Sequence, residues 1–77
     1  MDRQNLEAIF LAEGISADAY DLTGNGKSEA YVLREEPSGW SVFYSERGLE
    51  TGTVTFAAEG DACAHILSLL RADPTTS

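Results

Sequence analysis

Residues 29–56 read EAYVLREEPSGWSVFYSERGLETGTVTF, and this stretch decides the fold. It contains three runs rich in aromatic and β-branched residues, at 29–35, 40–46 and 51–56, which predict three β-strands. Turn-forming residues separate the runs, with Pro-Ser-Gly at 37–39 and Arg-Gly at 47–48. Links this short predict an antiparallel meander, because parallel pairing needs a long crossover connection.

The side chains of these runs also predict the strand register. A four-residue loop at 36–39 would place Leu33 opposite Val42, and a three-residue loop at 47–49 would place Val42 opposite Val54. Both loops gather the larger apolar side chains on one face: Tyr31, Leu33, Trp40, Val42, Tyr44, Val54 and Phe56. The other face then carries Ala30, Val32, Arg34, Ser41, Phe43, Ser45, Thr51, Thr53 and Thr55. On that face we expect Val32 and Phe43 to lie side by side in an open, otherwise polar surface.

Helical patterns flank the strands. Residues 2–13 have apolar residues at helical spacing behind Asp2, a good N-cap, and residues 59–72 carry a broader apolar stripe. Residues 19–22 could add a short fourth strand. The predicted fold class is therefore α+β: a helix, a three- to four-stranded antiparallel meander and a helix, with both helices on one sheet face. We expect one domain at 1–73 and a flexible C-terminal tail at 74–77.

The composition is strongly acidic. Thirteen Asp and Glu oppose five Lys and Arg, for a net charge of −8, and the chain has one Cys and one His. Such a charge attracts basic protein surfaces and repels nucleic acid, so we expect a protein partner and no nucleic acid. No apolar run approaches the roughly 20 residues of a membrane span, and the amphipathic N-terminus is unlike a signal peptide. We therefore expect a cytoplasmic protein without a membrane partner.

Two stretches contain residue types that bind metal ions. Residues 21–29, DLTGNGKSE, begin like a calcium loop, but Val32 stands where a bidentate Glu is needed, so a glycine-rich turn is the favoured reading. Cys63 and His65 are two apart on a predicted helix and diverge, so they cannot share a metal; Cys63 is expected in the core and His65 at its boundary. We expect no cofactor and no metal. An enzyme is the least favoured class and would need Glu29 or His65 in a cleft.

The predicted partner-binding residues follow from the open face and from the hairpin ends. Val32 and Phe43 form an apolar anchor in an open patch, as binding surfaces do. The hairpin ends and their neighbours add a charged rim: Tyr44, Glu46, Arg47, Glu35, Glu36 and Glu50. The alternative is that these ends are ordinary solvated turns.

The chain also resembles a known class of proteins. The runs AYVLR at 30–34 and GWSVFYSERG at 39–48, then Phe56 followed by EGDAC at 59–63 and a leucine-rich helix, are similar to small acidic immunity proteins of bacterial polymorphic toxin systems. The resemblance covers residues 29–75, and YSERG at 44–48 is its most specific element. It implies a non-enzymatic inhibitor that occludes the active site of a cognate toxin, either a nuclease or an NAD-consuming enzyme. The alternative is a small acidic adaptor or a homodimeric interaction module without a toxin partner. The free chain is expected to be a monomer or a homodimer.

Overall fold

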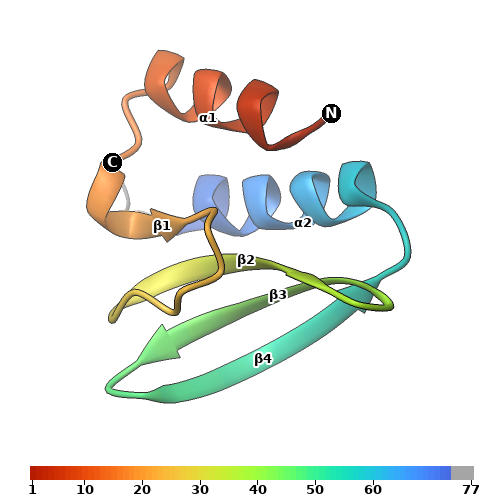
Figure 1. Cartoon of the computed structure of the whole chain (residues 1–77). Coiled ribbons are helices and arrows are strands. Elements are labelled where there is room, and N and C mark those ends of the chain that lie inside the picture. Colours follow the sequence, from red (N-terminus) through yellow and green to blue (C-terminus); the bar gives the residue numbers. More distant parts are fainter. Residues whose placement is uncertain (74–77) are drawn as a thin grey trace.

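Two helices and a four-stranded sheet make up the fold (Figure 1). The computed structural model describes residues 1–73, so the predicted tail at 74–77 lies outside the described residues. The elements follow in the order α1 (Arg3–Ala12), η1 (Ala17–Ala19), β1 (Tyr20–Asp21), β2 (Ala30–Glu36), β3 (Gly39–Glu46), β4 (Leu49–Phe56) and α2 (Glu59–Ala72). The predicted α+β class is confirmed.

Both helices lie on the same side of the sheet, as predicted (Figure 1). Asp2 caps α1, and its carboxylate accepts a hydrogen bond of 2.9 Å from the backbone N–H of Asn5. The helix α2 packs on β2 and β3, and α1 packs on α2. The core between these layers consists of Leu6, Phe10, Ile15, Tyr20, Leu33, Val42, Ala62, Cys63, Ile66, Leu67 and Leu70.

The register of the central hairpins is the predicted one. Leu33 lies opposite Val42 in the β2–β3 pair, and Val42 lies opposite Val54 in the β3–β4 pair. The turn between β2 and β3 is tighter than the predicted four-residue loop, because the ladder continues to the Glu36–Gly39 pair. The pairing is unchanged by this, so the face that meets the helices is also the predicted one.

The turn between β3 and β4 differs from the predicted three-residue loop. Arg47 and Gly48 both have positive φ, 51° and 83°, and they form a two-residue turn that pairs Glu46 with Leu49. This combination matches the right-handed twist of a hairpin. The prediction of a three-residue loop at 47–49 is therefore wrong, because the turn contains only Arg47 and Gly48.

A β-bulge restores the predicted register farther along β4. The ladder shifts between Val42 and Tyr44, where β4 contains Gly52 with φ of 66°. Between the turn and the bulge, β4 is offset by one residue from the prediction. Thr51 consequently lies opposite Tyr44 on the helix side, and Glu50 lies opposite Ser45 on the other face. The expected position of Thr51 on the open face is thus wrong.

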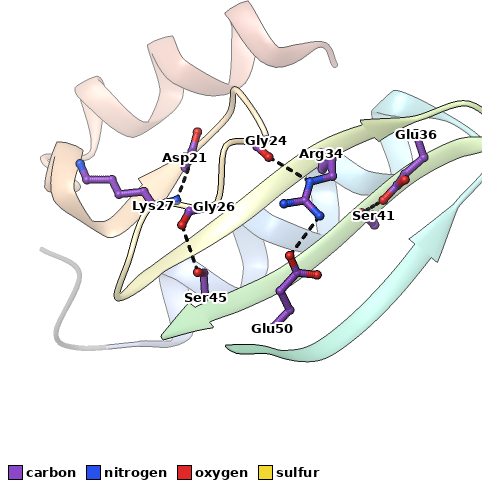
Figure 2. Close-up of polar contacts among 9 residues, drawn as sticks. All are labelled: Asp21, Gly24, Gly26, Lys27, Arg34, Glu36, Ser41, Ser45 and Glu50. Atoms are coloured by element: carbon purple, nitrogen blue, oxygen red, sulfur yellow. Dashed lines mark hydrogen bonds and ion pairs between the residues drawn. The ribbon is translucent and has the colours of Figure 1, made fainter. Parts of the chain in front are cut away.

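The first strand also differs from the prediction, because β1 runs parallel to β2 and the sheet is mixed. Its two residues pair as Tyr20–Tyr31 and Asp21–Val32. A strand this short needs no helical crossover. The connection at 22–29 returns to the start of β2 by crossing the sheet face opposite the helices (Figure 2).

The last strand, β4, lies at the edge of the sheet and is exposed along almost its whole length. Val54 was expected under the helices, yet it is 40% exposed. The helix α2 covers β2 and β3 and reaches β4 at Phe56, whose ring packs against His65 with centroids 5.2 Å apart. Among residues 1–73, no strand pairs with the outer edge of β4.

Candidate functional site

The loop at 22–29 covers the sheet face that was predicted to be open. The carbonyl oxygen of Gly24 accepts a hydrogen bond of 2.9 Å from Nε of Arg34, and that of Gly26 accepts one of 3.3 Å from Oγ of Ser45 (Figure 2). Beneath this cover Val32 is 0% exposed and Phe43 is 1% exposed. The expected open patch of Val32 and Phe43 is therefore wrong. They pair opposite each other as predicted, but inside a second small core.

Asp21 holds this loop in shape. Its Oδ1 accepts the N–H of Thr23 at 2.8 Å, and its Oδ2 accepts the N–H of Lys27 at 3.0 Å. Burial alone would raise the pKa of this carboxyl, but the hydrogen bonds from Thr23, Lys27 and Gly26 outweigh it and the pKa lies below its usual value. The residue that began the calcium-like motif thus organises the loop backbone. Between residues 1 and 73 no group of three or more His, Cys, Asp or Glu is placed to hold a metal ion.

The predicted charged rim is divided between two ends of the sheet. Tyr44, Glu46 and Arg47 lie at the β3–β4 turn, while Glu35 and Glu36 lie at the β2–β3 turn. A strand rises about 3.3 Å per residue, so the length of β3 separates the two groups by roughly 20 Å. They do not form one surface.

The acidic residues at the far end and on the covered face have partners within the chain. Glu35 lies 3.9 Å from Arg3, and Glu36 accepts a hydrogen bond of 2.9 Å from Oγ of Ser41. Glu50 pairs with Arg34 at 3.1 Å on the face that the loop covers (Figure 2). The residues around Tyr44 are therefore the part of the predicted set that remains available for a partner.

Beside Tyr44 the surface forms a hollow of about 200 Å³. Its lining comes from η1 and the segment before it, from the ends of β2 and β3, and from the residue after α2: Ser16, Asp18, Ala19, Glu29, Tyr31, Tyr44 and Asp73. We call these residues the tyrosine hollow. Apart from Tyr44, its members were missed as binding residues, because four separate segments supply them and no local pattern joins them.

Two tyrosine rings and several carboxylates define the chemistry of the tyrosine hollow. The rings of Tyr31 and Tyr44 meet edge to face, with centroids 5.0 Å apart and an interplanar angle of 66°. Oη of Tyr31 donates a hydrogen bond of 3.0 Å to Oδ2 of Asp73. Burial, together with nearby carboxylates, raises the pKa of both tyrosines, and Glu46 and Glu29 contribute at Tyr44. The phenols therefore stay neutral beside negative charge.

The acidic groups around the hollow are only partly neutralised. Asp18 pairs with Lys27 at 3.1 Å. Glu29, which has a left-handed φ of 57°, and Glu46 are exposed and form no ion pair with any residue between 1 and 73. The hollow combines aromatic walls with uncompensated negative charge, which is suited to a cationic group.

Cys63 and His65 lie where the sequence predicted them, in the core and at its boundary. Cys63 is completely buried in the core, and burial raises the pKa of its thiol. His65 is half-buried at the edge of the core against Phe56. As for membranes, no helix formed by residues 1–73 is both long enough and apolar enough to span one.

Comparison of the chain with protein-family models, with curated proteins and with solved structures finds no match.

Proposed function

We propose that this chain is a protein inhibitor that binds a basic protein partner through the end of the sheet that carries the tyrosine hollow. The partner we propose is a bacterial toxin, a nuclease or an NAD-consuming enzyme, which the chain neutralises in the cytoplasm by covering its active site. In this proposal the chain performs no chemistry of its own. It supplies shape, aromatic surface and negative charge.

The distribution of charge carries the proposal. Four of the five basic residues, Arg3, Lys27, Arg34 and Arg71, form ion pairs within the chain. Near the hollow, the carboxylates of Glu29 and Glu46 and the guanidinium of Arg47 are exposed and form no ion pair among residues 1–73, so unpaired negative charges outnumber the unpaired positive one there. A surface of this kind speeds the approach of a basic protein and disfavours acidic partners.

The toxin class comes from the sequence resemblance at 29–75, and above all from YSERG at 44–48. In the structure this element forms the end of β3 and its turn; Tyr44 lines the tyrosine hollow, and Glu46 is near enough to contribute to the raised pKa of Tyr44. The YSERG element therefore lies at the same end of the sheet as the tyrosine hollow and its unpaired carboxylates. This coincidence is the reason we prefer a toxin inhibitor to a general adaptor.

The test uses the protein encoded by the gene next to this one. Expressed alone in a bacterial host, that protein should arrest growth, and co-expression of this chain should restore growth and yield a complex of the two. A double variant, Glu29→Gln with Glu46→Gln, should bind at least about tenfold more weakly, mainly through slower association. A control with the same change in net charge, Glu7→Gln with Asp61→Asn, alters exposed residues on the two helices and should bind nearly as well as the unmodified chain.

Two results would contradict the proposal. A neighbouring protein that neither arrests growth nor binds this chain would remove the toxin partner. Equal weakening by the two double variants would show that only the overall charge matters, and that the hollow end of the sheet has no special role.

The unpaired edge of β4 favours a second candidate, a homodimeric interaction module. The outer edge of β4 offers unpaired backbone groups, and only Glu50 is charged among its residues. Two copies could pair along this edge, although a net charge of −8 on each copy opposes association. The sheet face that carries Val32 and Phe43 is not available for pairing of two copies, because the loop at 22–29 covers it.

Sedimentation of the purified chain at two salt concentrations separates the candidates. Edge pairing predicts a dimer that is strengthened by salt and abolished by Thr53→Pro, since proline removes a donor from the strand. If the chain sediments as a monomer at both salt concentrations, the homodimeric module is excluded and the inhibitor proposal is unaffected.

A further inference from the structure

At two places among residues 1–73, an arginine lies over an aromatic ring and is held there by a carboxylate. The guanidinium of Arg3 lies 5.1 Å from the centroid of the Trp40 ring, and its Nε lies 3.5 Å from Glu59. The guanidinium of Arg34 lies 4.7 Å from the centroid of Phe43, and its Nη1 lies 3.1 Å from Glu50. In each unit the ring attracts the cation and the carboxylate fixes its position.

The tyrosine hollow contains the same components except for the arginine. Tyr31 and Tyr44 supply the rings, and Asp18, Glu29 and Asp73 supply the carboxylates. Among residues 1–73, no basic side chain lies over either tyrosine ring. Lys27 forms an ion pair with Asp18 at the rim of the hollow. Arg47 forms no ion pair among residues 1–73, and its backbone N–H donates a hydrogen bond to Oγ of Ser28.

We infer that the tyrosine hollow binds the guanidinium group of an arginine side chain supplied by a protein partner. This inference rests on the proposed function and deepens it, because it names the group on the basic partner that is recognised. The guanidinium would lie against the tyrosine rings while Glu29 accepts its hydrogen bonds. The arrangement would repeat between two proteins what Arg34, Phe43 and Glu50 do within one.

Size and chemistry both favour arginine as the occupant. A hollow of about 200 Å³ is smaller than the roughly 300–1,000 Å³ of pockets for drug-sized ligands and cofactors, so it suits one side chain. A guanidinium is planar and weakly hydrated, so it loses less solvation than the ammonium of lysine when it stacks on a ring. Arginine is also enriched at the energetic centres of protein interfaces.

The test needs no natural partner. The probes are three short peptides that are identical except for a central arginine, citrulline or lysine, where citrulline keeps the shape of arginine and lacks its charge. Each peptide is titrated into the isotopically labelled full chain and followed by amide NMR shifts. The arginine peptide should give saturable shifts concentrated at Glu29, Tyr31 and Tyr44, and the citrulline and lysine peptides should bind at least about fivefold more weakly.

Variants separate the rings, the local charge and the overall charge. Tyr44→Leu and Glu29→Gln should each weaken binding of the arginine peptide by about fivefold or more. Asp61→Asn removes the same charge as Glu29→Gln, but at the distant start of α2, and should leave the affinity within about twofold. If Tyr44→Leu does not fold, Glu29→Gln and Asp61→Asn still decide the question.

The inference is overturned if the citrulline or lysine peptide binds as well as the arginine peptide. It is equally overturned if the shifts spread over the acidic surface, or if Asp61→Asn weakens binding as much as Glu29→Gln. These outcomes are distinct from failure of the proposed function. If the chain protects cells from a toxin but does not bind the arginine peptide, the proposed function stands and the arginine site is wrong. If it binds the peptide but does not protect cells, the arginine site stands and the proposed function is wrong.

Discussion

The guanidinium carbon of Arg34 lies 4.7 Å from the centroid of the Phe43 ring, so a charged side chain on β2 forms the outer cover of an aromatic residue on β3. The same guanidinium donates from Nε to Gly24 and from Nη1 to Glu50. One side chain therefore joins the crossing loop, the sheet face and the edge strand. This arrangement explains why Phe43 is buried on a face that no helix covers.

The Arg34 cover predicts unequal effects for two substitutions. Arg34→Ala removes both the polar contacts and the aliphatic stem that shields Phe43, so we expect a loss of about 2 kcal/mol in the free energy of unfolding. Arg34→Met keeps a stem over the ring and should cost about 1 kcal/mol. Urea denaturation followed by Trp40 fluorescence measures both. Equal losses for the two variants would show that the stem contributes nothing.

The register of the central strands was predictable because each face constrains it independently. Leu33 and Val42 are both buried on the helix side in the observed pairing, and a slip of one residue between β2 and β3 would turn one of them to the opposite face. The turn at Arg47 and Gly48 was harder to predict. The observed turn is one residue shorter than the predicted loop, and the bulge at Gly52 compensates farther along the strand, so the error affects only residues 49–52.

The covered face and the tyrosine hollow could not be predicted, for one common reason. Both depend on where the segment from 16 to 29 lies over the sheet, and its hydrogen bonds to Arg34 and Ser45 join residues distant in sequence. Alternation within β2 and β3 shows that Val32 and Phe43 share a face, but it cannot show what covers them. Likewise, nothing local places Asp73 beside Tyr31.

Asp21 predicts a loss of stability in acid. Its pKa is lower in the folded chain than in the unfolded chain, so its contribution is present above about pH 4 and is lost as the pH falls through the folded pKa. Asp21→Asn keeps one acceptor oxygen but turns an NH₂ group toward loop N–H donors. We expect it to cost about 1–3 kcal/mol at neutral pH.

Urea denaturation of both proteins across the acidic range provides the control for Asp21. Glu13 also has a lowered pKa, through its hydrogen bond with Arg71, so the unmodified chain should lose stability from more than one group. The difference between the two proteins should shrink as the pH falls. A difference that stays constant down to the lowest pH would show that ionisation of Asp21 does not stabilise the loop.

Two glycines in turns predict very different tolerance of alanine. A Cβ at Gly39 would clash with the carbonyl oxygen of Phe56, whereas a Cβ at Gly48 would meet nothing within 4 Å. Both have positive φ, 152° at Gly39 and 83° at Gly48, so each alanine adds about 1–3 kcal/mol of backbone strain. Gly39→Ala must in addition move the backbone at the end of β4. Thermal unfolding should place Gly39→Ala well below Gly48→Ala, and similar melting temperatures would contradict the close approach.

The position of Cys63 predicts that its thiol reports on global unfolding. Cys63 is 0% exposed within the core, and burial raises its pKa, so little of the reactive thiolate is present in the folded state. A water-soluble thiol reagent should therefore react only when the core opens, and its rate should rise with urea in parallel with the unfolded fraction. Arg34→Ala, which destabilises the opposite face, should accelerate the reaction by roughly the factor set by its loss of stability, provided that unfolding is cooperative. Rapid labelling at zero urea, unaffected by Arg34→Ala, would mean that α2 opens locally from the sheet without unfolding of the rest.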